Sequence, residues 1–177
     1  MIRVGKISLR ARTEADVPIL HAELHEDVAT EMRASSNAWQ PIAIGPSSPY
    51  ALREPSPDRA LFSAVEVASG ELAGEATLWG IDAHNRRGHV GMALRPGYRS
   101  RGLAADVVQA LCYYGFVVRG LNRLQLETLA DNEPMKRAAA RCGFVHEGTL
   151  RRASWVAGGF ADDYVMGLLA QDWQAPA

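Results

Sequence analysis

The 177-residue sequence has almost no net charge and no long hydrophobic run. Its formal net charge is −1, whereas general nucleic-acid binders carry a strong positive balance. No run approaches the roughly 18 apolar residues of a membrane span, and the N-terminus lacks the apolar core of a signal peptide. We therefore expect a cytoplasmic protein with neither nucleic acid nor a membrane as partner.

Cysteine is also scarce, with only Cys112 and Cys142 in the chain. Two cysteines are too few for a disulfide framework and do not show the spacing of a metal site, so we expect reduced thiols that pack, and no bound metal. Neither a linker nor an internal repeat divides the chain. The sequence predicts one domain over residues 1–177.

The two commonest phosphate-binding loops, G-x-x-x-x-G-K-[ST] and G-x-G-x-x-G after a strand, are absent. Residues 94–111, "LRPGYRSRGLAADVVQAL", instead place three arginines and a glycine before an apolar-periodic run. A helix start has unpaired N–H groups and about half a unit of positive charge, which together favour an anion. Gly102 would allow close approach, and Arg99 and Arg101 would add donors. Alone, the stretch fits a pyrophosphate cradle and a tightly packed, arginine-rich helix start equally well.

Hydrophobic periodicity alternates between strand and helix along the chain, which indicates a mixed α/β or α+β domain. A long loop rich in Ser, Pro and Gly, residues 34–58, has the character of a lid or binding loop. Thr13 can cap the first helix, with Asp16 three residues later. Helices are expected over about 13–33, 103–118 and 132–143, and strands over 2–13, 60–82 (two, joined by a turn), 88–96, 123–130, 144–156 and 160–170.

Residues 99–104, "RSRGLA", match the R/Q-x-x-G-x-G/A signature of the GNAT superfamily of N-acetyltransferases. The stretches "LAGEATLWGIDAHNRRGHVGMALRPGYRSRGLA", "RLQLETLADNEPMKRAAARCGF" and "HEGTLRRASWVAGGFADDYVMGLL" resemble its ribosomal-protein alanine acetyltransferase branch in order and spacing. The resemblance implies a single mixed, mostly antiparallel sheet of about seven strands. Its central pair would be splayed, and about four helices would flank it.

The same resemblance implies acetyl-CoA as cosubstrate and a site for it. The residues that it assigns to CoA binding are Met92, Ala93, Leu94, Arg99, Arg101, Gly102, Leu103, Ala104 and Asn132. The first three would line the pantetheine arm, and an amide near Leu94 would contact the thioester oxygen. Asn132 would bind the pantetheine end of the cofactor, a role compatible with capping a helix.

The sequence departs from the family where protons must move. His89 stands where the branch usually has a glutamate, and it is the first candidate base because histidine titrates near neutral pH. Glu75 is the second candidate. Either one could instead be an ordinary strand residue. The family's acid positions fall at Ala139 and Met135, so no general acid can be assigned.

The acceptor is left open by the sequence. Six carboxylates and no Lys or Arg occupy residues 14–31, and in this family the early helices line the acceptor side, which would suit a cationic amine. The amine would be a protein N-terminus or a small molecule. A larger acyl donor, such as propionyl- or succinyl-CoA, and a catalytically silent acyl-CoA-binding protein are the alternatives. A homodimer is the oligomer that the resemblance suggests.

Overall fold

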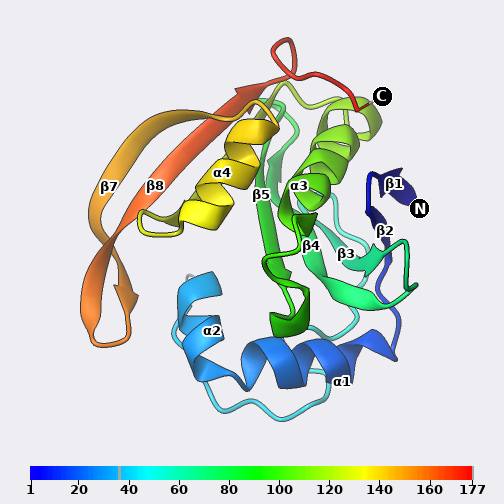
Figure 1. Cartoon of the computed structure of the whole chain (residues 1–177), viewed down its shortest axis with the longest axis vertical. Coiled ribbons are helices and arrows are strands. Elements are labelled where there is room, and N and C mark those ends of the chain that lie inside the picture. The colour runs from blue at the N-terminus through cyan, green and yellow to red at the C-terminus, as the bar shows by residue number, and fades with distance from the viewer. Residues whose placement is uncertain (36, 177) are drawn as a thin grey trace.

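The computed structural model describes residues 1–35 and 37–176 and shows one eight-stranded sheet with helices packed against it (Figure 1). The strand order is β1-β2-β3-β4-β5-β6-β8-β7, and neighbouring strands are antiparallel except β5 and β6, which are parallel. The strands are β1 Ile2–Val4, β2 Ile7–Ala11, β3 Ala60–Glu66, β4 Leu72–Asp82, β5 Arg87–Leu94, β6 Arg123–Leu129, β7 Val145–Val156 and β8 Gly159–Leu169.

Four α-helices accompany the sheet in these described ranges, which agrees with the expected number. The helices are α1 Asp16–Leu20, α2 Val28–Ala34, α3 Leu103–Tyr113 and α4 Glu133–Arg141, with π-helical turns at His21–His25 and Tyr114–Val118 and a 3-10 turn at Pro96–Tyr98. None of the helices in residues 1–35 and 37–176 has the length and apolar character needed to cross a membrane.

The predicted mixed, mostly antiparallel sheet is confirmed, with one difference at the N-terminus. The strand expected over residues 2–13 is two strands, because the chain turns at Gly5 and Lys6. Gly5 has a φ of +52°, a left-handed conformation that glycine adopts without steric cost. The sheet therefore has eight strands rather than about seven.

The apolar stripe of α3 forms the centre of the core. Leu103, Val107 and Leu111 are each at most 1% exposed, and α3 contacts β1, β2, β4 and β5. Full burial of such side chains stabilises a fold by about 1.5–3 kcal/mol each. The helical spacing predicted from sequence is confirmed, and this packing holds the start of α3 in place beside β5.

Asp16 joins the first helix to the sheet instead of serving as part of a simple capping box. Its buried carboxylate accepts two bonds from the Arg10 guanidinium, at 2.6 and 2.8 Å, and one from the Ser63 hydroxyl at 2.8 Å. The N–H and hydroxyl of Thr13 also donate to it, at 2.8 and 3.0 Å. Thr13 was expected to cap the helix, but no side chain caps α1, which begins after Ala15.

We expect Asp16→Asn to destabilise the fold by about 3 kcal/mol, because it breaks a buried ion pair on one side. Burial acts to raise the pKa of Asp16, but the bonds from Arg10, Thr13 and Ser63 outweigh it and hold the pKa well below its usual value. A lowered folded-state pKa stabilises the fold above the ordinary pKa of about 3.9, and that stability is lost as the pH falls through the folded value. Urea unfolding at pH 7 and pH 3 measures both effects.

The exposed Asp172→Asn is the matched control and should leave the free energy of unfolding within about 0.5 kcal/mol of wild type. The Asp16 variant should also lose less stability than wild type between pH 7 and pH 3. Equal losses in the two proteins would contradict this account of Asp16.

Candidate active site

The parallel pair β5 and β6 splays apart, as the family resemblance implied. The two strands pair only over their first three residues, and the last pair is His89 with Gln125. Beyond that pair, β5 continues along β4, and β6 continues along β8. A gap therefore opens in the middle of the sheet, closed at His89 and widening toward Leu94.

Strand alternation determines which backbone groups face this gap. The N–H of Arg95 donates to the carbonyl of Ala73 on β4 at 2.9 Å, so the main-chain groups of Ala93, two residues earlier, also face β4. Those of Met92 and Leu94 face the opposite way, into the gap. The N–H that we expect to contact the thioester oxygen would therefore be that of Met92 or Leu94, because the N–H of Ala93 faces β4.

The start of α3 lies next to the wide end of the gap and carries bare amide groups. Gly102 is the N-cap residue, with a left-handed φ of +77° and no atom within 4 Å of where a Cβ would stand. No side chain caps this helix, and the N–H groups of Gly102, Leu103 and Ala104 meet no acceptor in the described part of the chain. An anion at this point would find donors already in position.

The two arginines of the signature, which were expected to add donors, have protein partners in the structure. Arg101 donates to Glu66 at 2.6 Å. Arg99 donates from Nε to the carbonyl of Leu94 at 3.0 Å and from Nη2 to the hydroxyl of Thr30 on α2 at 3.2 Å. The backbone amides are thus the unengaged donors of the cradle, and a direct role of either guanidinium in cofactor binding stays a prediction.

Asn132 follows β6 and caps α4, as the sequence indicated. Its Oδ1 accepts from the N–H of Met135 at 3.3 Å, and its Nδ2 donates to Thr128 on β6 at 2.9 Å. The contact with pantetheine stays a prediction. Met135 packs against the core and Ala139 is fully buried, so neither of the family's acid positions supplies a proton donor here.

Glu75 lies beside the gap wall, since its register partner on β5 is Ala93. Its neighbour Ala76 is buried in the core with α3, so Glu75 points to the opposite side of the sheet, called here the α1 face because Ala93 packs there against Leu20 of α1. Burial raises the pKa of Glu75, although its bond from Arg12 Nη2, at 2.8 Å, acts to lower it. Such a carboxylate is a better base than an exposed one.

His89 occupies the closed end of the gap. Its ring stacks on Trp79 at 4.4 Å between centroids, and its Nδ1 lies 3.9 Å from Glu127 Oε1. Burial lowers its pKa, partly offset by Glu127. Ala93 lies four positions after His89, about 13 Å along the strand, so the two candidate bases are not brought together.

The six early carboxylates do not form one acidic face. Asp16 is structural, Asp27 accepts from the N–H of Thr30 and caps α2, and Glu23 pairs with an arginine. Glu31 on α2 is the one of these carboxylates on which the charge of Glu75 acts. Its pKa is raised by burial and further by the charge of Glu75, while His25 opposes the shift.

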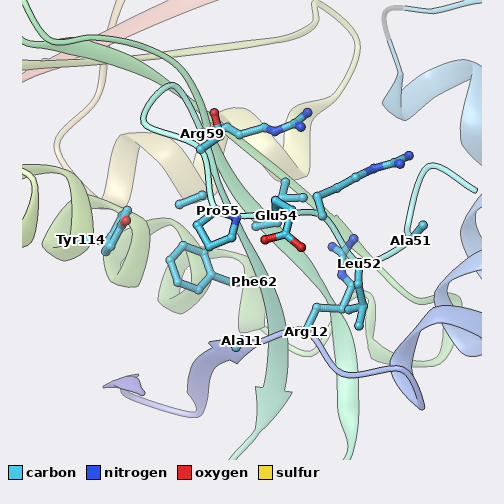
Figure 2. A pocket seen from close by; sticks show the side chains of 13 residues that line it. Ala11, Arg12, Ala51, Leu52, Glu54, Pro55, Arg59, Phe62 and Tyr114 are labelled. Carbon is cyan, nitrogen blue, oxygen red and sulfur yellow. The ribbon is translucent and has the colours of Figure 1, made fainter. Parts of the chain in front are cut away.

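Sequence reasoning missed Arg12, which is 63 positions from Glu75 and has no local signature. Arg12 also borders a cavity of about 310 Å³ between the loop 51–59 and the start of β3. Figure 2 shows Phe62 and Tyr114 on one side of this cavity and Arg12 with Leu52 on the other. Because β3 and β4 separate it from the gap, the cavity is not the cofactor site.

Two parallel strands splay apart beside a helix start whose N–H groups have no acceptor in the described part of the chain. Such a site suits a long cofactor that has an anionic group and an extended arm. The family model named Acetyltransferase (GNAT) domain matches residues 6–145, and the chain belongs to this family. The match includes β5, which forms one wall of the gap, the start of α3 at Gly102, and Asn132.

Individual relatives are similar over shorter stretches. The chain is 30% identical to the uncharacterized N-acetyltransferase p20 of Bacillus licheniformis, over 63% of each chain. It is 28% identical to the putative ribosomal N-acetyltransferase YdaF of Bacillus subtilis, over 59% of this chain and 57% of that one. The matches therefore span about three-fifths of these relatives' lengths.

The fold also matches a solved structure. The spermidine N-acetyltransferase of Vibrio cholerae, in complex with CoA and spermine, superposes with a TM-score of 0.76 over 94% of this chain and 97% of that chain. At 18% sequence identity, this likeness shows the shared fold.

Proposed function

We propose that the protein is an N-acyltransferase that moves an acetyl group from acetyl-CoA to a primary amine within a ternary complex. The observation that carries the proposal is that the unpaired N–H groups of the α3 start lie beside the gap-facing main chain of β5, at the wide end of the gap. The amides of the α3 start would hold the CoA pyrophosphate, and the gap-facing groups of Met92 and Leu94 would hold the pantetheine arm. Family membership supports the same cofactor.

The amine nitrogen would attack the thioester carbon, and the resulting oxyanion would accept the N–H of Met92 or Leu94. The C–S bond then breaks, and the CoA thiolate leaves and takes up a proton. An alkyl ammonium with a pKa near 10 must first lose a proton. We propose Glu75 as the acceptor of that proton, because it adjoins the wall at Ala93, whereas His89 lies about 13 Å along the strand.

Two mutually interacting carboxylates, Glu31 and Glu75, favour a cationic acceptor. Each is mostly buried, and the pKa of Glu31 is raised by burial and further by the charge of Glu75. An ammonium group between them would relieve the repulsion of the two carboxylates. A polyamine, the class of ligand seen in the Vibrio cholerae neighbour, is the first small-molecule acceptor to test, and a protein N-terminal amine is the second.

The test is release of CoA thiol from acetyl-CoA in the presence of a panel of polyamines, aminoglycosides, amino acids and N-terminal peptides. We expect release that depends on one amine class, with the acetylated product identified by mass spectrometry. Parallel runs with propionyl- and succinyl-CoA identify the acyl group. CoA binding without amine-dependent release would support a silent acyl-CoA-binding protein, and no CoA binding at all would contradict the proposal.

We also propose that the protein is cytoplasmic and pairs as a homodimer through β7. This twelve-residue strand forms the edge of the sheet opposite to β1 (Figure 1). It exposes Val145, Leu150 and Trp155, each at least half accessible. Long exposed edge strands readily pair with another chain, which supports this choice of surface.

A further inference from the structure

Behind the cradle lies a set of contacts that the proposed reaction does not use. Arg101 donates to Glu66 at 2.6 Å, and the Tyr98 hydroxyl donates to Glu71 at 2.6 Å. The Arg101 guanidinium also sits over the Tyr98 ring, 5.0 Å from its centroid. Both side chains thus reach away from the bare amides and toward the turn between β3 and β4.

Hydrogen bonds fix the turn between β3 and β4. Glu66 ends β3 and Glu71 directly precedes β4, and the N–H of Glu66 donates to the carbonyl of Glu71 at 2.9 Å. The Ser69 hydroxyl donates to the second carboxylate oxygen of Glu66, also at 2.9 Å. Glu66 is 6% exposed. Its carboxylate is therefore held on both oxygens in a fixed place.

Residues 100–102, which Glu66 contacts through Arg101, have an unusual backbone conformation. Ser100 and Gly102, on either side of Arg101, have left-handed φ values of +59° and +77°. A left-handed serine is unfavourable and persists only where surrounding contacts impose it. Arg101 lies between the two unusual residues, so its bond to Glu66 acts where the backbone must be constrained.

Two carboxylates behind an anion site are unfavourable on electrostatic grounds alone, because like charges repel. Glu66 would also compete with a phosphate for Arg101. We propose that Glu66 and Glu71 are positioning residues of the CoA cradle, which act through Arg101 and Tyr98 to hold residues 100–102 in the conformation that presents the amides. This inference rests on the cofactor site of the proposed function.

The two roles of Arg101 predict opposite signs for Glu66→Gln. If the pair positions the cradle, the substitution loosens residues 100–102, and the Kd for CoA rises by about tenfold or more, the effect of losing one charge-assisted hydrogen bond. If Arg101 is instead a phosphate ligand restrained by Glu66, the substitution frees it and removes a negative charge, so the Kd falls. Calorimetric titration with CoA, at fixed ionic strength, distinguishes the two.

Tyr98→Phe is the second variant, because it removes the hydroxyl bond to Glu71 and keeps the packed ring. It should also weaken CoA binding, with little change in melting temperature. The exposed Glu54→Gln, away from the cradle, should bind CoA as wild type does. Wild-type protein that fails to bind CoA would contradict the proposed function. Wild-type binding together with equal or tighter binding by both variants would overturn the positioning role alone.

Discussion

Replacing Gly102 with glutamate should raise the Kd for CoA by more than about 100-fold and leave the domain folded. No atom lies within 4 Å of the added Cβ, so the side chain starts from open space beside the amides. Its carboxylate would neutralise the field of the helix start and repel the pyrophosphate. The expected loss of affinity is therefore electrostatic and steric, and it is measured by titration with CoA.

The backbone cost of this substitution needs its own control. A non-glycine residue at a φ of +77° costs about 1–2 kcal/mol, which would lower the melting temperature by several degrees. Gly158 in the turn between β7 and β8 has a φ of +87° and equally open surroundings. Gly158→Glu should show the same loss of stability and wild-type affinity for CoA. If the Gly102→Glu variant binds CoA as tightly as wild type, the start of α3 is not the cofactor site.

Glu75→Gln should lower kcat by about 100- to 10,000-fold, the usual contribution of a general base, with the Kd for CoA unchanged. Burial raises the pKa of this carboxyl by disfavouring its charged form. The base must be deprotonated to act, so kcat/KM of the wild type should rise with pH through a pKa above the usual value of about 4.3. In the Glu75→Gln variant, kcat/KM should no longer rise with pH through this pKa.

His89→Gln is the matched variant at the other candidate base. It should reduce kcat by less than about tenfold, because the imidazole lies at the closed end of the gap, away from Ala93. The reverse result, a large loss at His89 and a small one at Glu75, would restore histidine as the base. Because Glu75→Gln leaves Arg12 without its acid, thermal unfolding must show that the variant is folded before its kcat is interpreted.

The order of elements and the helix start at Gly102 could be predicted from the sequence because their signals are local. The stripe of Leu103, Val107 and Leu111 repeats at helical spacing within one segment, and the signature 99–104 is contiguous. Asn132 combines a cap position with a family match. Each of these depends on residues a few positions apart, where backbone geometry alone decides which side chains share a face.

The early carboxylates show the limit of that reasoning. Their density in residues 14–31 suggested one acidic face, yet several of them have different partners in the structure. Asp16 bonds to Ser63, 47 positions away, whereas Glu31 lies 3.9 Å from His25 and its pKa is raised by burial and by the charge of Glu75. Charge composition records how many carboxylates are present, whereas burial and pairing across the sheet decide which of them can bind a ligand.

The sequence by itself determined the fold class, the position of the helix start at Gly102 and the family resemblance, since these follow from periodicity and from one contiguous motif. Only the tertiary structure decided that the gap closes at His89, that Glu75 adjoins its wall, and that Arg101 turns back to Glu66. Those features join residues 18 to 36 positions apart in the chain. Strand register and burial determine these long-range contacts, and neither property can be predicted from a few adjacent residues.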